Sequence, residues 1–530
     1  MVIGFVRRHW KWAVTLLFGV AVFFFWNCLY PQSLSYHEQK QLFLWTWGYL
    51  ATDLSVAGGL ADWLSEFMVQ FYYVIWLGAL CLALFFIAFQ RLSYLVFADL
   101  AGSDGWIVYM LSYVLPIVMI LLMGDINLMT AFPVAVVLSL LAVWMMNKAA
   151  SKCKRSIWLD ILLIPIIYWA VGGGCTWLYL VLRLIFILRN GYGRGIDRKL
   201  MYCCSFLYLL CLQVVADKTL LQQWPQKSVY LGLNYYLVPM KYPGEKIGYD
   251  ATVYELLMQD YLVRNERWDD IIERAEKYQV TAVFSSNCIN LALAQKGQLA
   301  DRMFEFYQTG DDALLLHRVR DNMSTYPTME AFWRLGLVNS CLRYAADLQE
   351  SILNARKSGR LTKRLAECYM VNGNYPAAKK NIDLLKHSLF YRKWAKEAGR
   401  MLGNEALINN HPVYGKVRRL RFKNDMMFSY REKHKILGQL FMNNPQNRMA
   451  LSYFLGELLL RGDHNMFLHY LPWAKQYGGY LNMPWGYQDA VKAIETRGAL
   501  KNSPYAEYGK RQSQKQMAHI QVPEMEESVK

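Results

Sequence analysis

The chain has 530 residues, of which 55% are hydrophobic and only 19% charged, a composition between those of soluble and fully integral membrane proteins. Only Cys288, Cys341 and Cys368 lie far from apolar stretches, an odd number without metal-ligand spacing, so neither a disulfide framework nor a zinc site is indicated. The net charge is +17, and residues 217–530 alone carry about +12, which favours anionic partners or simply a solvated basic surface.

The N-terminus has the features of a retained membrane helix. Arg7, Arg8 and Lys11 precede an apolar run over residues 12–30. This run is long, rich in Phe and Trp, and followed by Tyr30-Pro31-Gln32 rather than by a cleavage site of small residues. It is therefore not interpreted as a signal peptide.

Apolar runs of roughly membrane-spanning length recur through the first 216 residues. Seven are found, at about 12–30, 68–89, 106–123, 128–146, 157–171, 175–188 and 200–216. The fifth and sixth are short and separated by Gly172-Gly173-Gly174. They form either a tight hairpin or one re-entrant unit, which would reduce the number to six.

The basic residues between these runs predict the orientation. With the N-terminus in the cytoplasm, twelve Lys and Arg fall on the inner side, whereas the outer connections carry Lys40 alone. The inner residues are Arg7, Arg8, Lys11, Arg91, Lys148, Lys152, Lys154, Arg155, Arg189, Arg194, Arg198 and Lys199. The positive-inside rule therefore places residues 217 onward outside, which makes a nucleic-acid partner improbable.

The longest outer connection, residues 31–67, mixes Trp and Tyr with acidic residues. This mixture is typical of helices that lie in the membrane interface. Gly58-Gly59 is expected to divide the segment in two.

The C-terminal half is predicted to be a helical-repeat domain. An aromatic and basic linker, 217–250, leads to amphipathic helices over 251–501 and a flexible tail over 502–530. Breaks inside helical pairs are predicted at Asn265–Ile271, Lys296–Ala300, Cys341–Ala346 and Asn372–Ala378. Trp268, Leu299, Leu342 and Tyr375 are separated by 31, 43 and 33 residues, which brackets a 34-residue period.

The strongest candidate for chemistry is His37-Glu38, just after the first apolar run. A carboxylate beside an imidazole at a partly dry interface can accept a proton from an incoming hydroxyl. The alternative is an ordinary polar start of a loop. Asp125, in the outer turn Gly124–Asn127, could cap the next helix, pair with a cation, or bind a divalent ion together with Glu38.

Other polar groups lie in or near the apolar runs. Asp160 is expected to meet Lys154 or Arg155, and Arg183 to extend toward the inner face. Outside, Lys218, Lys241, Tyr235 and Tyr236 either form an interfacial belt or hold the sugar and pyrophosphate of a lipid-linked glycan.

The membrane half resembles the C-type (GT-C) glycosyltransferases, which carry an acidic residue in the first outer loop, just after the first helix, followed by interfacial helices. The resemblance implies a polyprenyl-phosphate-linked donor and maps Glu38, and more weakly Asp125, onto acidic positions; His37 stands where one member of the usual acidic pair is expected. Residues Ala366–Leu385, with Tyr375 and Ala377, resemble a tetratricopeptide repeat. The layout is also similar to multi-pass inner-membrane proteins of Bacteroidota.

The predicted fold is therefore all-α, with a polytopic membrane bundle of about seven helices followed by an extracytoplasmic helical-repeat solenoid. The function expected is a bacterial inner-membrane glycosyl- or oligosaccharyltransferase that uses a lipid-linked donor on the periplasmic side, with a divalent cation as an open question. The alternative is a membrane-anchored scaffold whose repeats bind periplasmic or envelope proteins. A transporter is less favoured by the sequence than either of these two functions.

Overall fold

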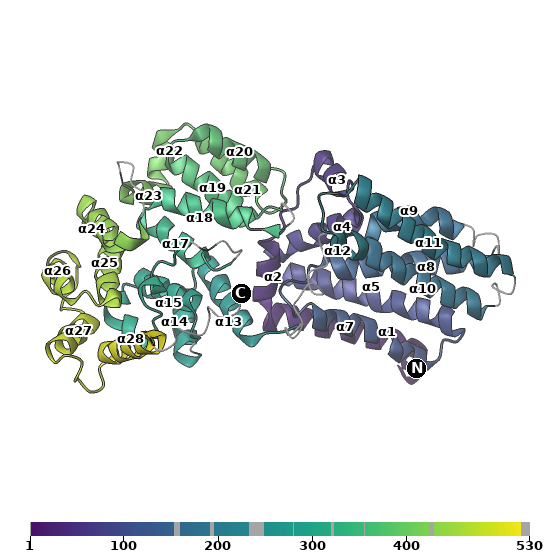
Figure 1. The fold of residues 1–530 in the computed structure, drawn as a ribbon, viewed down its shortest axis with the longest axis horizontal. Helices are drawn as coiled ribbons and strands as arrows, with labels where there is room; N and C mark the ends of the chain where they lie inside the picture. Colours follow the sequence, from purple (N-terminus) through teal and green to yellow (C-terminus); the bar gives the residue numbers. More distant parts are fainter. Residues whose placement is uncertain are drawn as a thin grey trace. The chain divides into compact units, whose positions relative to one another are not determined.

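The computed structural model describes residues 2–152, 159–190, 196–232, 248–278, 280–317, 319, 323–353, 356–422 and 429–520. These residues are helical throughout, with no β-strand among them. The chain divides into two compact units, whose helices are labelled in Figure 1. Unit 1 comprises Met1–Ala251, Leu353–Gly359 and Leu384–Lys393. Unit 2 comprises Thr252–Ile352, Arg360–Asp383 and Trp394–Lys530. Two short segments of the predicted repeat domain thus belong to the N-terminal unit.

Unit 1 is built from long apolar helices joined by short ones. The helices are α1 (Val2–Phe24), α2 (Pro31–Glu38), α3 (Trp47–Asp53), α4 (Gly59–Val69), α5 (Ile75–Ala101), α6 (Trp106–Leu111), α7 (Val114–Leu122), α8 (Ala131–Lys152), α9 (Leu159–Val171), α10 (Gly173–Arg189), α11 (Ile196–Thr219) and α12 (Gln226–Leu231). A π-helical turn, Phe25–Leu29, extends α1, and a 3-10 turn, Gln70–Tyr73, precedes α5.

Three helical stretches of the described chain are long and apolar enough to cross a membrane: Trp10–Leu29, Ile75–Ala101 and Ala131–Ser151. Trp106–Leu122 and Leu159–Val171 are apolar but shorter. The second predicted run is displaced toward the C-terminus, because Val74 has extended backbone (φ −110°, ψ 103°) and α5 begins only after it.

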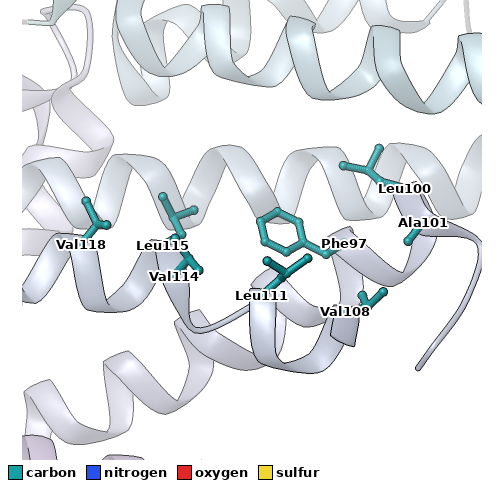
Figure 2. A pocket seen from close by; sticks show the side chains of 8 residues that line it. All are labelled: Phe97, Leu100, Ala101, Val108, Leu111, Val114, Leu115 and Val118. Atoms are coloured by element: carbon teal, nitrogen blue, oxygen red, sulfur yellow. The ribbon is translucent and has the colours of Figure 1, made fainter. Parts of the chain in front are cut away.

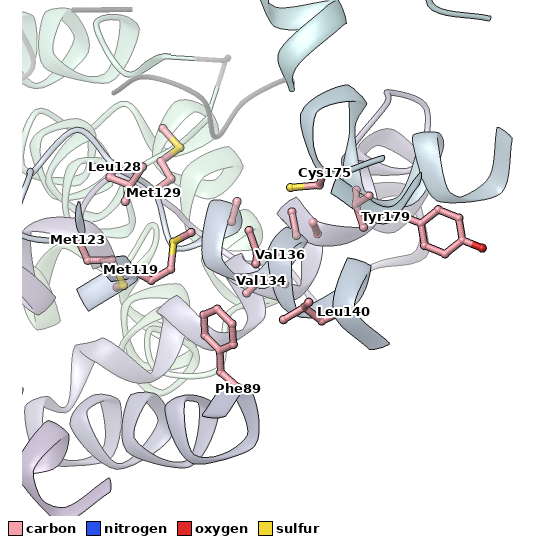
Figure 3. Packing of buried hydrophobic residues seen from close by; sticks show 14 of the residues in the cluster. Phe89, Met119, Met123, Leu128, Met129, Val134, Val136, Leu140, Cys175 and Tyr179 are labelled. Atoms are coloured by element: carbon pink, nitrogen blue, oxygen red, sulfur yellow. The ribbon is translucent and has the colours of Figure 1, made fainter. Parts of the chain in front are cut away.

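Buried apolar side chains of α5, α7, α8 and α10 form the core of unit 1. Figure 3 shows part of this cluster, including Phe89 of α5, Met119 of α7, Leu140 of α8 and Tyr179 of α10. Phe89, Leu140 and Tyr179 are completely buried. Close van der Waals packing of this kind holds the helices together.

The α9–α10 segment is a hairpin. Gly172 has a positive φ of 79° and separates the two helices, which pack against each other. An ion pair closes the hairpin: Arg183 Nη2 lies 2.8 Å from Asp160 Oδ2, and both side chains are completely buried. The two residues therefore satisfy each other, and the predictions that Asp160 meets Lys154 or Arg155 and that Arg183 extends to the surface are wrong; Lys154 and Arg155 lie outside the described residues.

Neutral groups complete the pairing of Asp160 with Arg183. The hydroxyl of Tyr202 donates to Asp160 Oδ2 at 2.8 Å, and that of Tyr179 donates to Oδ1. Arg183 Nη1 donates to Asn147 Oδ1 at 2.7 Å. A buried charge is tolerated only when it is paired and hydrogen-bonded, so this network joins α8, α9, α10 and α11.

Residues 251–520 form shorter helices. They are α13 (Ala251–Arg264), α14 (Trp268–Lys277), α15 (Val283–Gln295), α16 (Leu299–Arg302), α17 (Tyr326–Leu335), α18 (Val338–Glu350), α19 (Gly359–Val371), α20 (Tyr375–Leu385), α21 (Arg392–Met401), α22 (Glu405–Asn410), α23 (Tyr414–Leu420), α24 (Lys433–Asn443), α25 (Arg448–Arg461), α26 (His464–Tyr477), α27 (Trp485–Glu495) and α28 (Pro504–Ile520). Neighbouring helices pack as pairs, among them α14–α15, α17–α18, α24–α25 and α27–α28.

Three of the four predicted breaks are confirmed. Short non-helical segments separate α13 from α14, α15 from α16 and α19 from α20. The fourth is wrong, since Cys341–Ala346 lies inside α18 and the break falls at Gly336, whose φ of 85° ends α17. Glycine adopts this left-handed conformation without steric cost, so Gly336 can end α17. A repeat spacing centred on Leu342 gives no indication of this helix end.

The C-terminal segment also differs from the prediction. Residues predicted as a flexible tail form α28, in which Tyr505, Ala506 and Tyr508 are buried. Ser503 Oγ donates to Asp489 Oδ2 at 2.9 Å and so fixes the start of the helix. The flexible tail is predicted from the overall composition of the segment, which does not reveal that these three side chains pack in the interior.

Candidate functional site

The connection after the first apolar helix, residues 31–67, folds into short helices, and two glycines determine where α3 ends and α4 begins. Gly58, with a φ of 85°, separates α3 from α4, which confirms the predicted break. A Cβ atom on Gly59 would overlap the carbonyl oxygen of Asp53, so only glycine allows α4 to start this close to the end of α3. The loop is tied to the end of α9, because Trp169 Nε1 donates to Leu54 O at 2.8 Å.

The predicted pair His37-Glu38 lies in α2, where both side chains are buried. The hydroxyl of Tyr391 donates to Glu38 Oε1 at 2.8 Å. Burial lowers the pKa of His37 from 6.5 to about 4, with Lys40 acting in the same direction and Asp125 against it. His37 is therefore a neutral imidazole at pH 7.

Asp125 is close enough to His37 to affect its pKa, so the structure brings these two predicted residues together. The carboxylate of Asp125 accepts from Asn127 N at 3.0 Å and from Gly248 N at 3.3 Å. It therefore fixes its own turn, whereas the N-terminal end of α8 begins later, at Ala131.

Of the four predicted substrate-binding residues, the structure describes only Lys218. Its ammonium lies 3.7 Å from Asp217 Oδ2 at the end of α11. The predicted pair His37-Glu38 lies in a different helix, α2. Tyr235, Tyr236 and Lys241 lie outside the described residues.

The structure reveals an acidic cluster that sequence reasoning did not single out, formed by Asp53, Asp62, Glu66 and Arg356. Arg356 Nε lies 2.8 Å from Glu66 Oε1, and its Nη2 pairs with Asp62 Oδ1. Asp62 and Glu66 stand four residues apart on one face of α4. Burial raises the pKa of Glu66, although Arg356 opposes this effect.

Asp53 is the least buried member of the acidic cluster. It lies at the end of α3 and is only half-buried, whereas Asp62, Glu66 and Arg356 are buried. Its Oδ2 atom has no hydrogen-bond partner among the described residues. Burial and the neighbouring charge of Asp62 raise the pKa of Asp53 from 3.8 to about 7, against the effect of Arg356. Near neutral pH this carboxyl can therefore take up or release a proton.

Two late segments of the chain close over this loop within unit 1. Leu42 N donates to Lys357 O at 2.8 Å, and Trp45 N donates to His387 O at 2.9 Å. The ring of Phe390 stacks on Tyr73 with centroids 5.3 Å apart. These contacts place Arg356 beside Asp62 and Glu66, and Tyr391 beside Glu38.

Several buried polar atoms in the same loop lack a protein partner among the described residues. They are Gln32 Oε1, Ser33 Oγ, both amide atoms of Gln41, Asp53 Oδ2 and Gln70 Oε1. Buried polar groups are normally hydrogen-bonded, so such a concentration indicates a place where water or a polar ligand binds.

The described residues contain no group of three or more His, Cys, Asp or Glu side chains placed to hold a metal ion. In the acidic cluster, Arg356 takes the position that a cation would occupy between Asp62 and Glu66. A divalent ion shared by Glu38 and Asp125 stays a prediction.

In the part of the chain that the structure describes, fold and site together define a helical protein with three helices long and apolar enough to cross a membrane, and an acidic cluster in the loop after the first of them. The chain belongs to a family of unknown function (DUF6057), whose sequence profile matches residues 8–527. No curated protein and no solved structure matches it.

Proposed function

We propose that this protein is a membrane glycosyltransferase, or an enzyme similar to an oligosaccharyltransferase, that uses a lipid-linked sugar donor on the outer face of a bacterial inner membrane. The observation that carries the proposal is the half-buried carboxyl of Asp53, with its unpaired Oδ2, beside the Asp62–Arg356 pair. A carboxyl in this setting is suited to proton transfer.

The proposed step balances as a glycosyl transfer. The carboxylate of Asp53 accepts the proton of an acceptor hydroxyl while that oxygen forms a bond to the anomeric carbon of the donor sugar. The bond between this carbon and the phosphate oxygen breaks, and the polyprenyl phosphate leaves with the bonding electrons. Arg356 pairs with Asp62 beside the base, and the amides of Gln32, Gln41 and Gln70 offer hydrogen bonds to sugar hydroxyls.

Asp53 is better placed for the base than Glu38. The side chain of Glu38 is 4% exposed and accepts a hydrogen bond from Tyr391. In this proposal Glu38, His37 and Asp125 form the neighbouring wall of the site, with neutral His37 able to pass a proton onward. The aromatic residues Trp45 and Trp47, which are 54% and 86% exposed, suit the headgroup level of a membrane.

The same proposal includes the membrane topology of the chain. The seven apolar segments α1, α5, α6–α7, α8, α9, α10 and α11 cross the membrane with the N-terminus in the cytoplasm, and unit 2 is a periplasmic solenoid. The distribution of Lys and Arg supports this orientation. The resemblance to C-type glycosyltransferases is supported by carboxylates in the first outer loop.

The test is replacement of the gene by variants, with lipid-linked glycans measured by mass spectrometry. Asp53→Asn should leave the protein in the membrane at normal abundance and cause the lipid-linked donor to accumulate, as deletion does. The matched control is Thr52→Ala, which alters the exposed preceding residue of the same helix. A donor pool unchanged by deletion would refute the proposal.

A second candidate is a scaffold that binds envelope proteins through unit 2, whose neighbouring helices pack as pairs. Arg360 and Arg364 bind Glu330 at 3.2 and 2.8 Å, and this buried network joins α17 to α19. The guanidinium groups outweigh the effect of burial and lower the pKa of Glu330 to about 2. If the protein is a scaffold only, Asp53→Asn is silent and surface changes in unit 2 abolish function.

A further inference from the structure

A groove of about 490 Å³ opens on the surface of unit 1, between the C-terminal part of α5 and the pair α6–α7 (Figure 2). Every lining residue is apolar: Phe97 and Leu100 come from α5, and Leu111, Val114 and Val118 from α6 and α7. Leu111 and Val114 are 53% and 54% exposed. Water would solvate such a surface poorly.

The groove has the dimensions of one lipid tail. α5 is long and apolar enough to cross a membrane, and Trp106–Leu122 is apolar along its length. The wall from Val108 to Val118 spans about 15 Å at 1.5 Å per residue. This is half of a hydrocarbon core of about 30 Å, the depth that one acyl chain occupies.

A cation marks one end of the groove. The guanidinium of Arg189 donates to the carbonyl oxygen of Leu100, which lies in the last turn of α5. The Arg189 side chain is otherwise exposed. Leu100 lies at the same end of the groove in Figure 2 as Ala101. Arginine binds phosphate oxygens through two parallel N–H groups, which a headgroup at this end would meet.

Among the described side chains, the other charges at this end are two ion pairs and one stacked guanidinium. Lys148 lies 3.1 Å from Asp99, and Lys11 lies 3.6 Å from Asp104. Arg91 stacks over the ring of Trp12, with its guanidinium carbon 3.9 Å from the ring centroid. The two carboxylates are thus matched by the two lysines, and Arg189 retains its charge for an anion.

We propose that this groove binds one acyl chain of an anionic phospholipid, whose phosphate is held by Arg189. The apolar lining selects the tail, and the guanidinium selects the charged headgroup. The proposal does not depend on the transferase function, because no residue of the groove belongs to the acidic cluster.

The experiment is native mass spectrometry of the full chain released from nanodiscs that contain equal amounts of phosphatidylglycerol and phosphatidylcholine. The wild type should retain one phosphatidylglycerol. Leu111→Trp fills the groove and should abolish this retention. The control Leu84→Trp makes the same change at an exposed leucine of α5 outside the groove, 59% exposed, and should behave as the wild type.

Arg189→Gln tests the headgroup separately, because it removes the charge, together with the hydrogen bond to Leu100 O, and leaves the apolar lining unchanged. It should reduce the preference for phosphatidylglycerol over phosphatidylcholine about tenfold, as expected when a charge-assisted hydrogen bond is lost. Equal retention by Leu111→Trp and Leu84→Trp would show ordinary surrounding lipid and overturn the groove. An unchanged preference in Arg189→Gln would overturn the phosphate site.

Discussion

Arg356 Nε lies 2.8 Å from Glu66 Oε1, an ion pair that joins the loop after the first apolar helix to a segment far along the chain. Both side chains are buried, and the same guanidinium also pairs with Asp62. The segment that carries Arg356 is thereby part of unit 1 and of the candidate site.

Removal of Arg356 should destabilise unit 1. Arg356→Met leaves two buried carboxylates without their cation, which typically costs about 3–5 kcal/mol. We expect a clear decrease in the melting temperature of the purified protein in detergent. The triple variant Arg356→Met, Asp62→Asn, Glu66→Gln should recover much of the loss, whereas the exposed neighbour change Lys357→Met should have little effect. Equal melting of Arg356→Met and the wild type would show that the pair contributes nothing.

Acid sensitivity should depend on His37. Its pKa is about 4 in the folded protein and 6.5 when unfolded, so the folded state disfavours the imidazolium. The stability associated with His37 is complete above pH 6.5 and is lost as the pH falls toward 4. His37→Gln cannot titrate, so its melting temperature should fall less than that of the wild type over this range. Parallel curves for the two proteins would contradict the burial of a neutral histidine.

The ion pair inside the α9–α10 hairpin should be more costly to break than to replace. Asp160→Asn leaves Arg183 charged and completely buried, and we expect lower abundance in membranes and a lower melting temperature. Asp160→Asn combined with Arg183→Gln removes both charges and should recover most of the loss. If the double variant is worse than the single one, the charges themselves hold the hairpin.

Two glycines of the loop after the first apolar helix should respond oppositely to alanine. Gly59→Ala forces a Cβ atom into the backbone of Asp53, so α3 and α4 must move apart and the acidic cluster must distort. Gly48→Ala meets nothing within 4 Å and should stabilise α3 by up to about 1 kcal/mol. Melting temperature and donor turnover of both variants check this. Loss of activity in Gly48→Ala with none in Gly59→Ala would contradict the described loop.

The helices and their glycine breaks could largely be predicted, because length, apolar content and left-handed glycines act locally. Gly58 and Gly172 interrupt helices where the sequence indicated, whereas Gly336 was overlooked in favour of a repeat spacing centred on Leu342.

The site could be predicted only in part. The i,i+4 spacing of Asp62 and Glu66 indicates one helix face, but no local pattern identifies Arg356 as the partner, since that contact requires the chain to return from a distant segment. Likewise, the sequence predicts that Asp160 meets Lys154 or Arg155 and that Arg183 extends toward the inner face, because the hairpin that pairs them with each other is a tertiary feature.

The most direct test of the proposed transferase is the rate of lipid-linked donor consumption in isolated membranes between pH 5 and 9, for wild type and Asp53→Asn at equal abundance. The wild-type rate should rise with a midpoint near the Asp53 pKa of about 7, because the carboxylate is the active form. Asp53→Asn should be slower by about 10²–10⁴-fold. A variant that consumes the donor at the wild-type rate would contradict the account.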